Sequence, residues 1–140
     1  MRIALLLILL VTFRGVVAAD VWQCGEPRGI SMWSNEAHKP ALDGFAGVEP
    51  VVTIDRKEMT VAWGDTKLGV GAEKIWKLTV VHAASDTTSG IALDADLSGS
   101  ALMLYTLNKK SGYLYESVHK NNNADGLSIA ASYVAKCSRR

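Results

Sequence analysis

The sequence predicts an all-β protein: an antiparallel meander of about eight strands that forms a small barrel or a two-sheet sandwich. Three observations predict this fold. Between the two cysteines, apolar and polar residues alternate over short runs, with scarcely any helical periodicity. Clusters of turn-forming residues separate these runs at regular intervals. Cys24 and Cys137 lie near the two ends of the chain that follows an N-terminal apolar segment, so a bridge between them would join the first and last strands.

Residues 1–19 have the features of a secretion signal. Arg2 supplies a positive start, residues 3–13 form an apolar run, and Val17-Ala18-Ala19 offers small residues to a signal peptidase. The apolar run is shorter than the about 20 residues that a membrane-spanning helix needs. We therefore expect removal of this segment, a periplasmic or secreted location, no membrane span, and a single β domain over residues 20–140. The alternative is that residues 1–19 form a buried N-terminal strand or helix of the folded protein.

The expected strands follow one another along the chain. The first holds Trp22 and Cys24, which share a face because they are two residues apart. Residues 31–33 are a candidate short strand. Residues 108–112 are typical of a hairpin loop, and residues 121–126 of a longer turn. The remaining strands are expected at residues 51–54, 59–63, 74–82, 91–94, 101–107, 113–115 and 127–137.

Strand alternation also orients the two cysteines. In the last strand, Tyr133, Ala135 and Cys137 fall on one apolar row, and Lys136 falls on the opposite face. Both sulfur atoms therefore project toward the core, from first and last strands that can lie side by side. Two cysteines in an oxidising compartment usually pair, and closing a loop of about 100 residues stabilises a fold by roughly 4–5 kcal/mol in the chain-entropy treatment. The alternative is a pair of free or intermolecular thiols.

The charge of the chain is nearly balanced, with 15 Lys+Arg against 14 Asp+Glu. Two of the basic residues, Arg2 and Arg14, lie in the expected signal. This balance argues against a general binder of nucleic acid or of an anionic membrane, because such binding rests on clustered positive charge. The basic pairs Lys109-Lys110 and Arg139-Arg140 are expected in a solvated turn and tail.

Two longer irregular stretches, residues 25–47 and 64–71, are the expected places for a binding site, since function concentrates in loops on a rigid scaffold. In the first, Trp33, His38 and Phe45 are the candidate binding residues for a protein or small-molecule partner. The alternative is that Trp33 and Phe45 fold inward and plug one end of a barrel.

The sequence holds no recognisable catalytic, metal or cofactor motif, so we expect no enzymatic activity, no metal and no cofactor. His38, His82 and His119 lack the close spacing of a zinc site. Residues 94–99 begin like a calcium loop, but Tyr105 stands at the twelfth position, where a bidentate glutamate is needed. Glu73 and Glu116 could act as an acid–base pair, but nothing in their spacing supports this role. Both are expected on exposed strand faces.

Several stretches resemble a group of small exported bacterial proteins of unassigned function. The resemblance covers most of residues 20–140; it implies a periplasmic setting and supplies no activity. The stretches are Trp22-Gln23-Cys24, Ser31-Met32-Trp33-Ser34, Thr60-Val61-Ala62-Trp63-Gly64-Asp65, Leu104-Tyr105-Thr106-Leu107 and Val134-Ala135-Lys136-Cys137.

The layout of signal, first-strand cysteine, β meander and last-strand cysteine is also similar to that of the C-type lysozyme inhibitors. That family carries a Ser-Gly motif with paired tryptophans. Residues 112–117, Gly-Tyr-Leu-Tyr-Glu-Ser, are the nearest counterpart and depart from it, so no inhibitory residue carries over.

Three functions follow as hypotheses: a non-enzymatic binding protein, a carrier that holds a small apolar ligand in the barrel, and a hydrolase. An eight-stranded barrel has room for one small ligand or for its own side chains. The inward rows hold bulky residues, among them Met59, Trp76, Leu78 and Tyr133, which favours a filled barrel over a carrier. The hydrolase ranks last because no nucleophile or acid–base group stands out.

Overall fold

The computed structural model describes residues 19–55, 58–64, 74–96, 99–122 and 125–140. The expected signal, apart from Ala19, lies outside these residues, as do Glu73 and most of the glycine-rich stretch 64–71. In the described part of the chain, no helix is long and apolar enough to cross a membrane.

The described chain is all-β, as predicted, with one short 3-10 helix. The strands are longer and more numerous than the sequence indicated. In chain order the elements are β1 Asp20–Cys24, β2 Arg28–Trp33, η1 Ser34–Glu36, β3 Pro40–Gly44, β4 Val51–Asp55, β5 Glu58–Trp63, β6 Lys74–Ala83, β7 Thr87–Asp96, β8 Gly99–Asn108, β9 Tyr113–Asn122 and β10 Ser128–Arg139.

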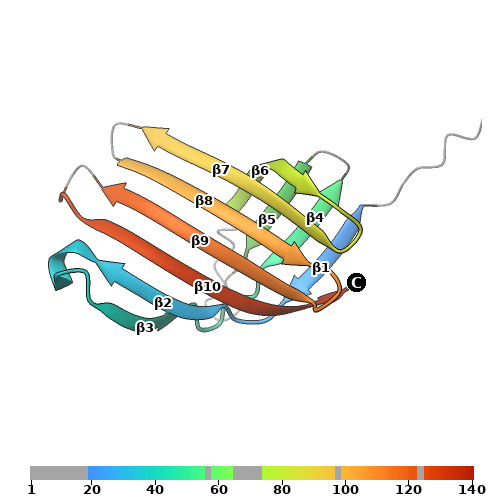
Figure 1. The fold of residues 1–140 in the computed structure, drawn as a ribbon, viewed down its shortest axis with the longest axis horizontal. Helices are drawn as coiled ribbons and strands as arrows, with labels where there is room; N and C mark the ends of the chain where they lie inside the picture. The colour runs from blue at the N-terminus through green and yellow to red at the C-terminus, as the bar shows by residue number, and fades with distance from the viewer. Residues whose placement is uncertain (1–18, 56–57, 65–73, 97–98, 123–124) are drawn as a thin grey trace, which may run out of the picture.

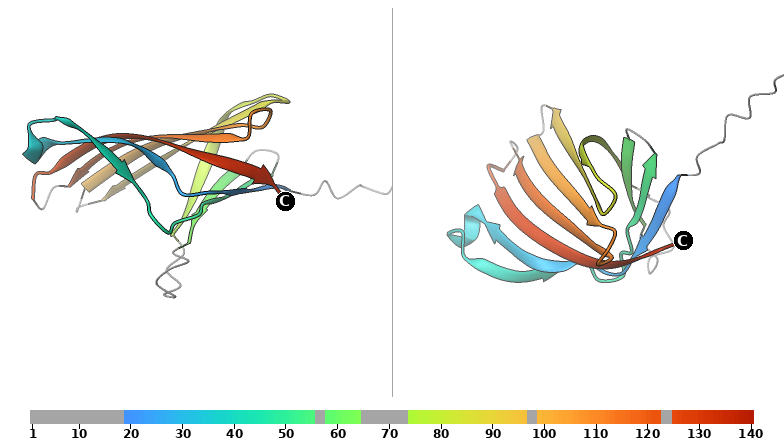
Figure 2. Two further views of the ribbon diagram at one scale, coloured as in Figure 1. Left: turned by 90° about the horizontal axis from the view of Figure 1, so that it is seen from below. Right: turned by 45° about the vertical axis from the view of Figure 1, so that its right-hand side comes forward.

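Eight antiparallel strands form a closed barrel, and the β2–β3 hairpin lies outside it. From β4 to β10 each strand pairs with the next one in the chain, and β1 closes the ring by pairing with both β4 and β10. The β2–β3 hairpin extends the sheet from the first half of β10, in the order β10-β2-β3. Figures 1 and 2 show the broad curved layer that β7–β10, β2 and β3 make on one side of the molecule.

The seam between β1 and β10 is short, and the disulfide lies in it. Only three residue pairs join these strands, ending with Cys24 opposite Cys137, whereas nine pairs join β9 to β10. The Cys24–Cys137 disulfide is formed, and it connects residues 113 positions apart. The sequence prediction that the two cysteines meet on adjacent first and last strands is therefore confirmed.

Inward side chains fill the barrel in the alternation that strands impose. On β8, Met103, Tyr105 and Leu107 are at most 1% exposed, whereas Leu102 and Leu104, which alternate with them, point outward. The same alternation holds on β4, β5, β9 and β10. Removing these apolar surfaces from water is the main source of stability, at about 25 cal/mol per Å².

Two elements were missed by the sequence analysis. β3 lies in the stretch expected to be irregular, and the first half of β7 precedes the strand expected at residues 91–94. Gly90 is in fact an inward position of β7. A Cβ atom there would lie 2.9 Å from the Leu78 Cβ and 3.3 Å from the Met59 Sδ, so glycine makes room for inward side chains of the nearby strands β6 and β5.

The turn before β10 gives the first testable prediction. Gly126 has φ +69°, and a Cβ atom added there would meet nothing within 4 Å. Replacing Gly126 by alanine is therefore expected to lower the free energy of unfolding by about 1 kcal/mol through backbone strain alone, as measured by urea denaturation. Gly64→Ala is the matched control, because Gly64 also has open space around it but lacks the positive φ. Equal effects of the two substitutions would contradict this explanation.

Candidate functional site

A row of polar side chains crosses the inside of the barrel. The strand registers place Tyr105, Glu116 and Tyr133 side by side on β8, β9 and β10, all pointing inward. The Tyr105 hydroxyl donates a hydrogen bond of 2.7 Å to Glu116 Oε1. The Tyr133 hydroxyl donates one of 2.8 Å to Asp43 Oδ2 on β3, which ties the outer hairpin to the barrel.

Burial makes Glu116 an unusual acid. Its side chain is only 7% exposed, and burial raises its pKa to about 7, against the smaller lowering effects of the Tyr105 hydrogen bond and the Lys120 charge. The expectation that Glu116 lies on an exposed face is wrong, because it shares the inward row of Leu114 and Val118.

The other members of this polar row are shifted in ways that fit their contacts. Burial, followed by the charge of Glu116 and the hydrogen bond to it, raises the pKa of Tyr105. Burial and then the hydrogen bond to Asp43 raise the pKa of Tyr133. The same hydrogen bond from Tyr133 lowers the pKa of Asp43. The row therefore pairs each phenol with a carboxyl group, and both phenols stay protonated.

Aromatic side chains cover this row. The Phe45 ring lies 5.1 Å from the Trp63 ring and 4.8 Å from the Tyr133 ring, measured between centroids. Two buried polar atoms of these residues have no hydrogen-bond partner: Glu116 Oε2 and Trp63 Nε1. The Trp63 indole is near enough to Tyr105 to lower the pKa of its phenol, although the two do not meet the geometry of a hydrogen bond.

The three residues that the sequence singled out do not form one site. Phe45 lies at the base of the β2–β3 hairpin, where its N–H donates to the Pro27 carbonyl, and its ring packs toward the barrel. Trp33 and His38 lie at the other end of the hairpin, linked by a hydrogen bond of 3.0 Å from the His38 N–H to the Trp33 carbonyl. Trp33 is half-buried on the same side of the sheet as Ser31, and His38 is exposed.

A second feature is the outer face, defined here as the outward side chains of β2, β3 and β7–β10. Because strands alternate, these side chains form rows across the sheet. One row contains Leu93, Leu102 and His119, and the next contains Leu104, Ile30 and Leu42. Exposure reaches 74% at Leu93 and 94% at Leu42.

Acidic side chains are missing from the described part of the outer face. The carboxyl groups on these six strands whose side chains are described are Asp43 and Glu116, and both belong to the inward polar row. The outward charged residues of the same strands are the exposed Arg28 and Lys136. The described side chains of the outer face thus include several exposed apolar residues and carry positive charge.

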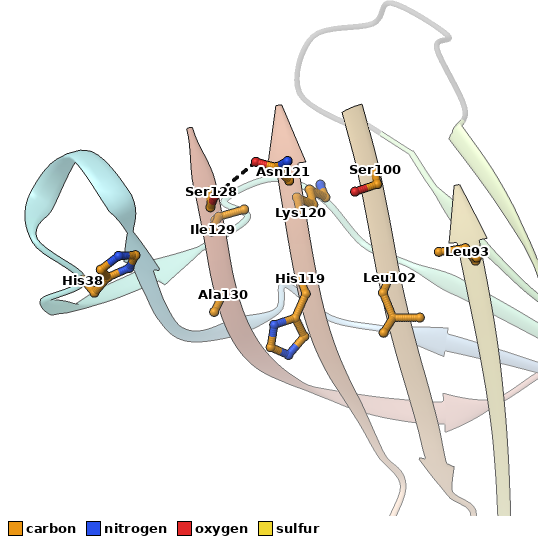
Figure 3. Close-up of a pocket in the computed structure, with 10 residues that line it drawn as sticks. All are labelled: His38, Leu93, Ser100, Leu102, His119, Lys120, Asn121, Ser128, Ile129 and Ala130. Carbon is orange, nitrogen blue, oxygen red and sulfur yellow. Dashed lines mark hydrogen bonds between the residues drawn. The ribbon is translucent and has the colours of Figure 1, made fainter. Parts of the chain in front are cut away.

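A hollow of about 300 Å³ opens at the end of the outer face nearest the β9–β10 turn (Figure 3). Apolar side chains, including Leu93 and Leu102, line part of it. In the polar part, the Ser128 hydroxyl donates a hydrogen bond of 3.1 Å to Asn121 Oδ1. No carboxylate is among the polar lining residues that the structure describes: His38, Ser100, His119, Lys120, Asn121 and Ser128. His38 reaches it from a turn in which Ala37 and His38 both have positive φ, 54° and 57°, an uncommon conformation for residues other than glycine.

The opposite end of the outer face is aromatic and basic. Tyr113 and Tyr115 have ring centroids 6.4 Å apart, and the Lys136 Nζ lies 4.3 Å from the centroid of the Tyr113 ring. Arg28 pairs with Val134 on β10, two residues from Lys136. Tyrosine and arginine are the residue types that most often carry binding energy in protein interfaces.

The fold and these surfaces define a closed, disulfide-linked β-barrel with an uncovered sheet face. Comparison with models of protein families, with curated proteins and with solved structures finds no match.

Sequence reasoning missed the outer face because its residues come from two distant parts of the chain. The alternation of Leu102 and Leu104 with buried neighbours was visible in the sequence. The position of the β2–β3 hairpin beside β10 was not, and it is this pairing that brings Ile30 and Leu42 to the same surface. His38 was identified correctly as a loop residue, but its neighbour His119 was considered only as a metal ligand.

Proposed function

We propose that this chain is an exported, non-enzymatic binding protein that engages another protein through the outer face. The observation that carries the proposal is the gathering of exposed Leu93, Leu102, Leu104, Ile30 and Leu42 in adjacent rows of one sheet surface. Single exposed apolar residues are ordinary, but contiguous apolar patches on soluble proteins mark interaction sites. The hydrogen-bonded strands of the sheet hold the backbone of these residues in place before binding, which lowers the entropic cost of association.

The filled barrel favours binding on the outer face over carriage of a ligand in the lumen. Tyr105, Met59 and Leu107 are completely buried within it, so the protein's own side chains occupy the space that an apolar ligand would need. The described hollow lies on the outer face instead. A small-ligand carrier is the second candidate function. It requires that Phe45, which is 36% exposed, move away from the barrel.

The chemistry of the polar row supports a binding role over catalysis. Glu116 has the raised pKa of a general acid or base, but Tyr105 binds one carboxyl oxygen and the barrel encloses the other. A substrate would have to enter the packed lumen to reach it.

Export is proposed from the disulfide together with the N-terminal sequence. Disulfides persist in the periplasm and outside the cell and are rare in the cytosol. The Cys24–Cys137 bond therefore fits the secretion signal expected over residues 1–19. The resemblance to exported bacterial proteins points to the periplasm.

The experiment is site-specific photo-crosslinking in the cell from which the chain comes. A photoreactive amino acid at Leu104, which is 41% exposed at the centre of the outer face, is compared with one at Ile75, which is 53% exposed on β6. We expect a protein adduct from position 104 and little from position 75, identified by mass spectrometry. Lysozyme inhibition is assayed in parallel, because the layout resembles that inhibitor family. Equal adducts from both positions, or none from position 104, would contradict the proposal.

A further inference from the structure

The charges of the outer face restrict the partner that it can bind. Among the side chains that the structure describes on its strands, the outward charged ones are basic, Arg28 and Lys136, and the two carboxyl groups, Asp43 and Glu116, belong to the inward row. Two copies of this chain packed face to face would bring like charges together, which costs free energy at an interface. A second copy is therefore a poor occupant, and a surface with negative charge is a good one.

The hollow adds a second, independent indication of an acidic partner. His38 approaches it from the turn between η1 and β3, and His119 approaches it from β9, with the Ser100 and Ser128 hydroxyls beside them. The two imidazoles and the Ser100 hydroxyl can donate hydrogen bonds into the hollow, whereas the Ser128 hydroxyl already donates to Asn121 Oδ1. A carboxylate is an acceptor with two oxygens, so it matches this lining, while Leu93 and Leu102 offer contact to the aliphatic part of the same side chain.

We propose that the partner is a protein segment that combines acidic and apolar side chains, with one carboxylate seated in the hollow and a second acidic group opposite Arg28 and Lys136. This inference rests on the proposed function, since it names the chemistry of the partner that the outer face binds. Tyr113 and Tyr115 lie beside the second position and supply the aromatic contact area that is typical of interface centres.

The test uses a phage-displayed library of random peptides, selected against the disulfide-intact protein at low salt. We expect the enriched peptides to combine Asp or Glu with Leu, Phe or other apolar residues. The affinity of the best peptide, measured by titration calorimetry, should fall with rising NaCl concentration, because salt screens exposed charge pairs.

Charge-reversal variants locate the binding. His119→Glu places a negative charge in the hollow and should weaken peptide binding about tenfold. Arg28→Glu should weaken binding several-fold, and Arg28→Lys should largely restore it. Lys77→Glu is the matched control, because Lys77 is exposed on β6, outside the outer face, and its affinity should stay within about twofold of wild type. An unchanged Tm shows that each variant is folded.

Several results would overturn the inference. The inference of an acidic partner fails if the enriched peptides lack acidic residues. It also fails if the His119→Glu and Arg28→Glu variants bind acidic peptides as well as wild type does. Binding to phosphatidylglycerol vesicles that displaces the peptide would identify a membrane as the partner, and a dimer that the peptide dissociates would identify a second copy. If crosslinking at Leu104 succeeds while these peptide results fail, the proposed function stands and the acidic partner does not.

Discussion

Loss of the Cys24–Cys137 disulfide is expected to lower the free energy of unfolding by roughly 4 kcal/mol. The bond joins residues 113 positions apart, and cross-linking so long a loop removes much of the entropy of the unfolded chain. It also reinforces the weakest part of the barrel, where only three residue pairs hold β1 to β10. Replacing both cysteines by alanine and following urea denaturation at pH 7 measures the effect. A loss below about 1 kcal/mol would contradict it.

Two controls separate the bridge from the packing of the sulfur atoms. Cys24 and Cys137 are 1% and 5% exposed, so alanine also leaves a small cavity. Wild-type protein treated with a reductant keeps both sulfur atoms and loses only the bond. It should be destabilised nearly as much as the double variant, and hydrogen exchange should then rise first in β1. Native mass spectrometry of untreated protein should show two hydrogens fewer than the reduced form.

Glu116→Gln is expected to change how stability depends on pH. The folded protein raises the pKa of Glu116 to about 7 by burial, well above that of a carboxyl group in an unfolded chain. The protonated form is therefore favoured by folding. Its contribution is fully present below about pH 4, declines as pH rises through 7, and is lost above that. Across this window the wild type should lose on the order of 3 kcal/mol relative to Glu116→Gln.

The difference between the two proteins isolates this one group, because all other titrating residues are common to both. Glutamine keeps the oxygen that accepts the Tyr105 hydrogen bond and carries no charge at any pH. At pH 8 the variant should therefore be the more stable protein in urea denaturation. Glu58→Gln on β5, an exposed carboxyl group, is the matched control. A difference that stays flat from pH 4 to pH 8 would show that Glu116 is not an acid with a raised pKa.

Much of the fold could be predicted from the sequence because its local signals agree with one another. The alternation in β10 placed Tyr133, Ala135 and Cys137 on the core side, where they are, and that in turn predicted the disulfide. The position of the β2–β3 hairpin could not be predicted. Its pairing with β10 links residues about a hundred positions apart in the chain, and nothing local distinguishes that arrangement from pairing with β1.

The site was harder to predict than the fold, for two physical reasons. Glu116 was expected in solvent because an ionised carboxylate is costly to bury; its raised pKa and its bond to Tyr105 reduce that cost. The outer face is a product of topology, since Leu104, Ile30 and Leu42 come to lie in one row only when β8, β9, β10, β2 and β3 pair in that order. Of the three candidate binding residues predicted from the sequence, only His38 lines the hollow on the outer face.

The most direct test of binding through the outer face is methyl NMR of the protein labelled at isoleucine, leucine and valine, titrated with the crosslinked partner or the selected peptide. Methyl groups lie both on the outer face and on the inner surface of the barrel, so the spectrum reports on these two surfaces separately. Ile30, Leu104 and Val134 point outward, and Leu107, Leu114 and Val118 point into the barrel. We expect the outward methyl signals to shift and the inward ones to stay in place. Shifts confined to the inward methyl groups would show that the ligand enters the barrel and would contradict the account.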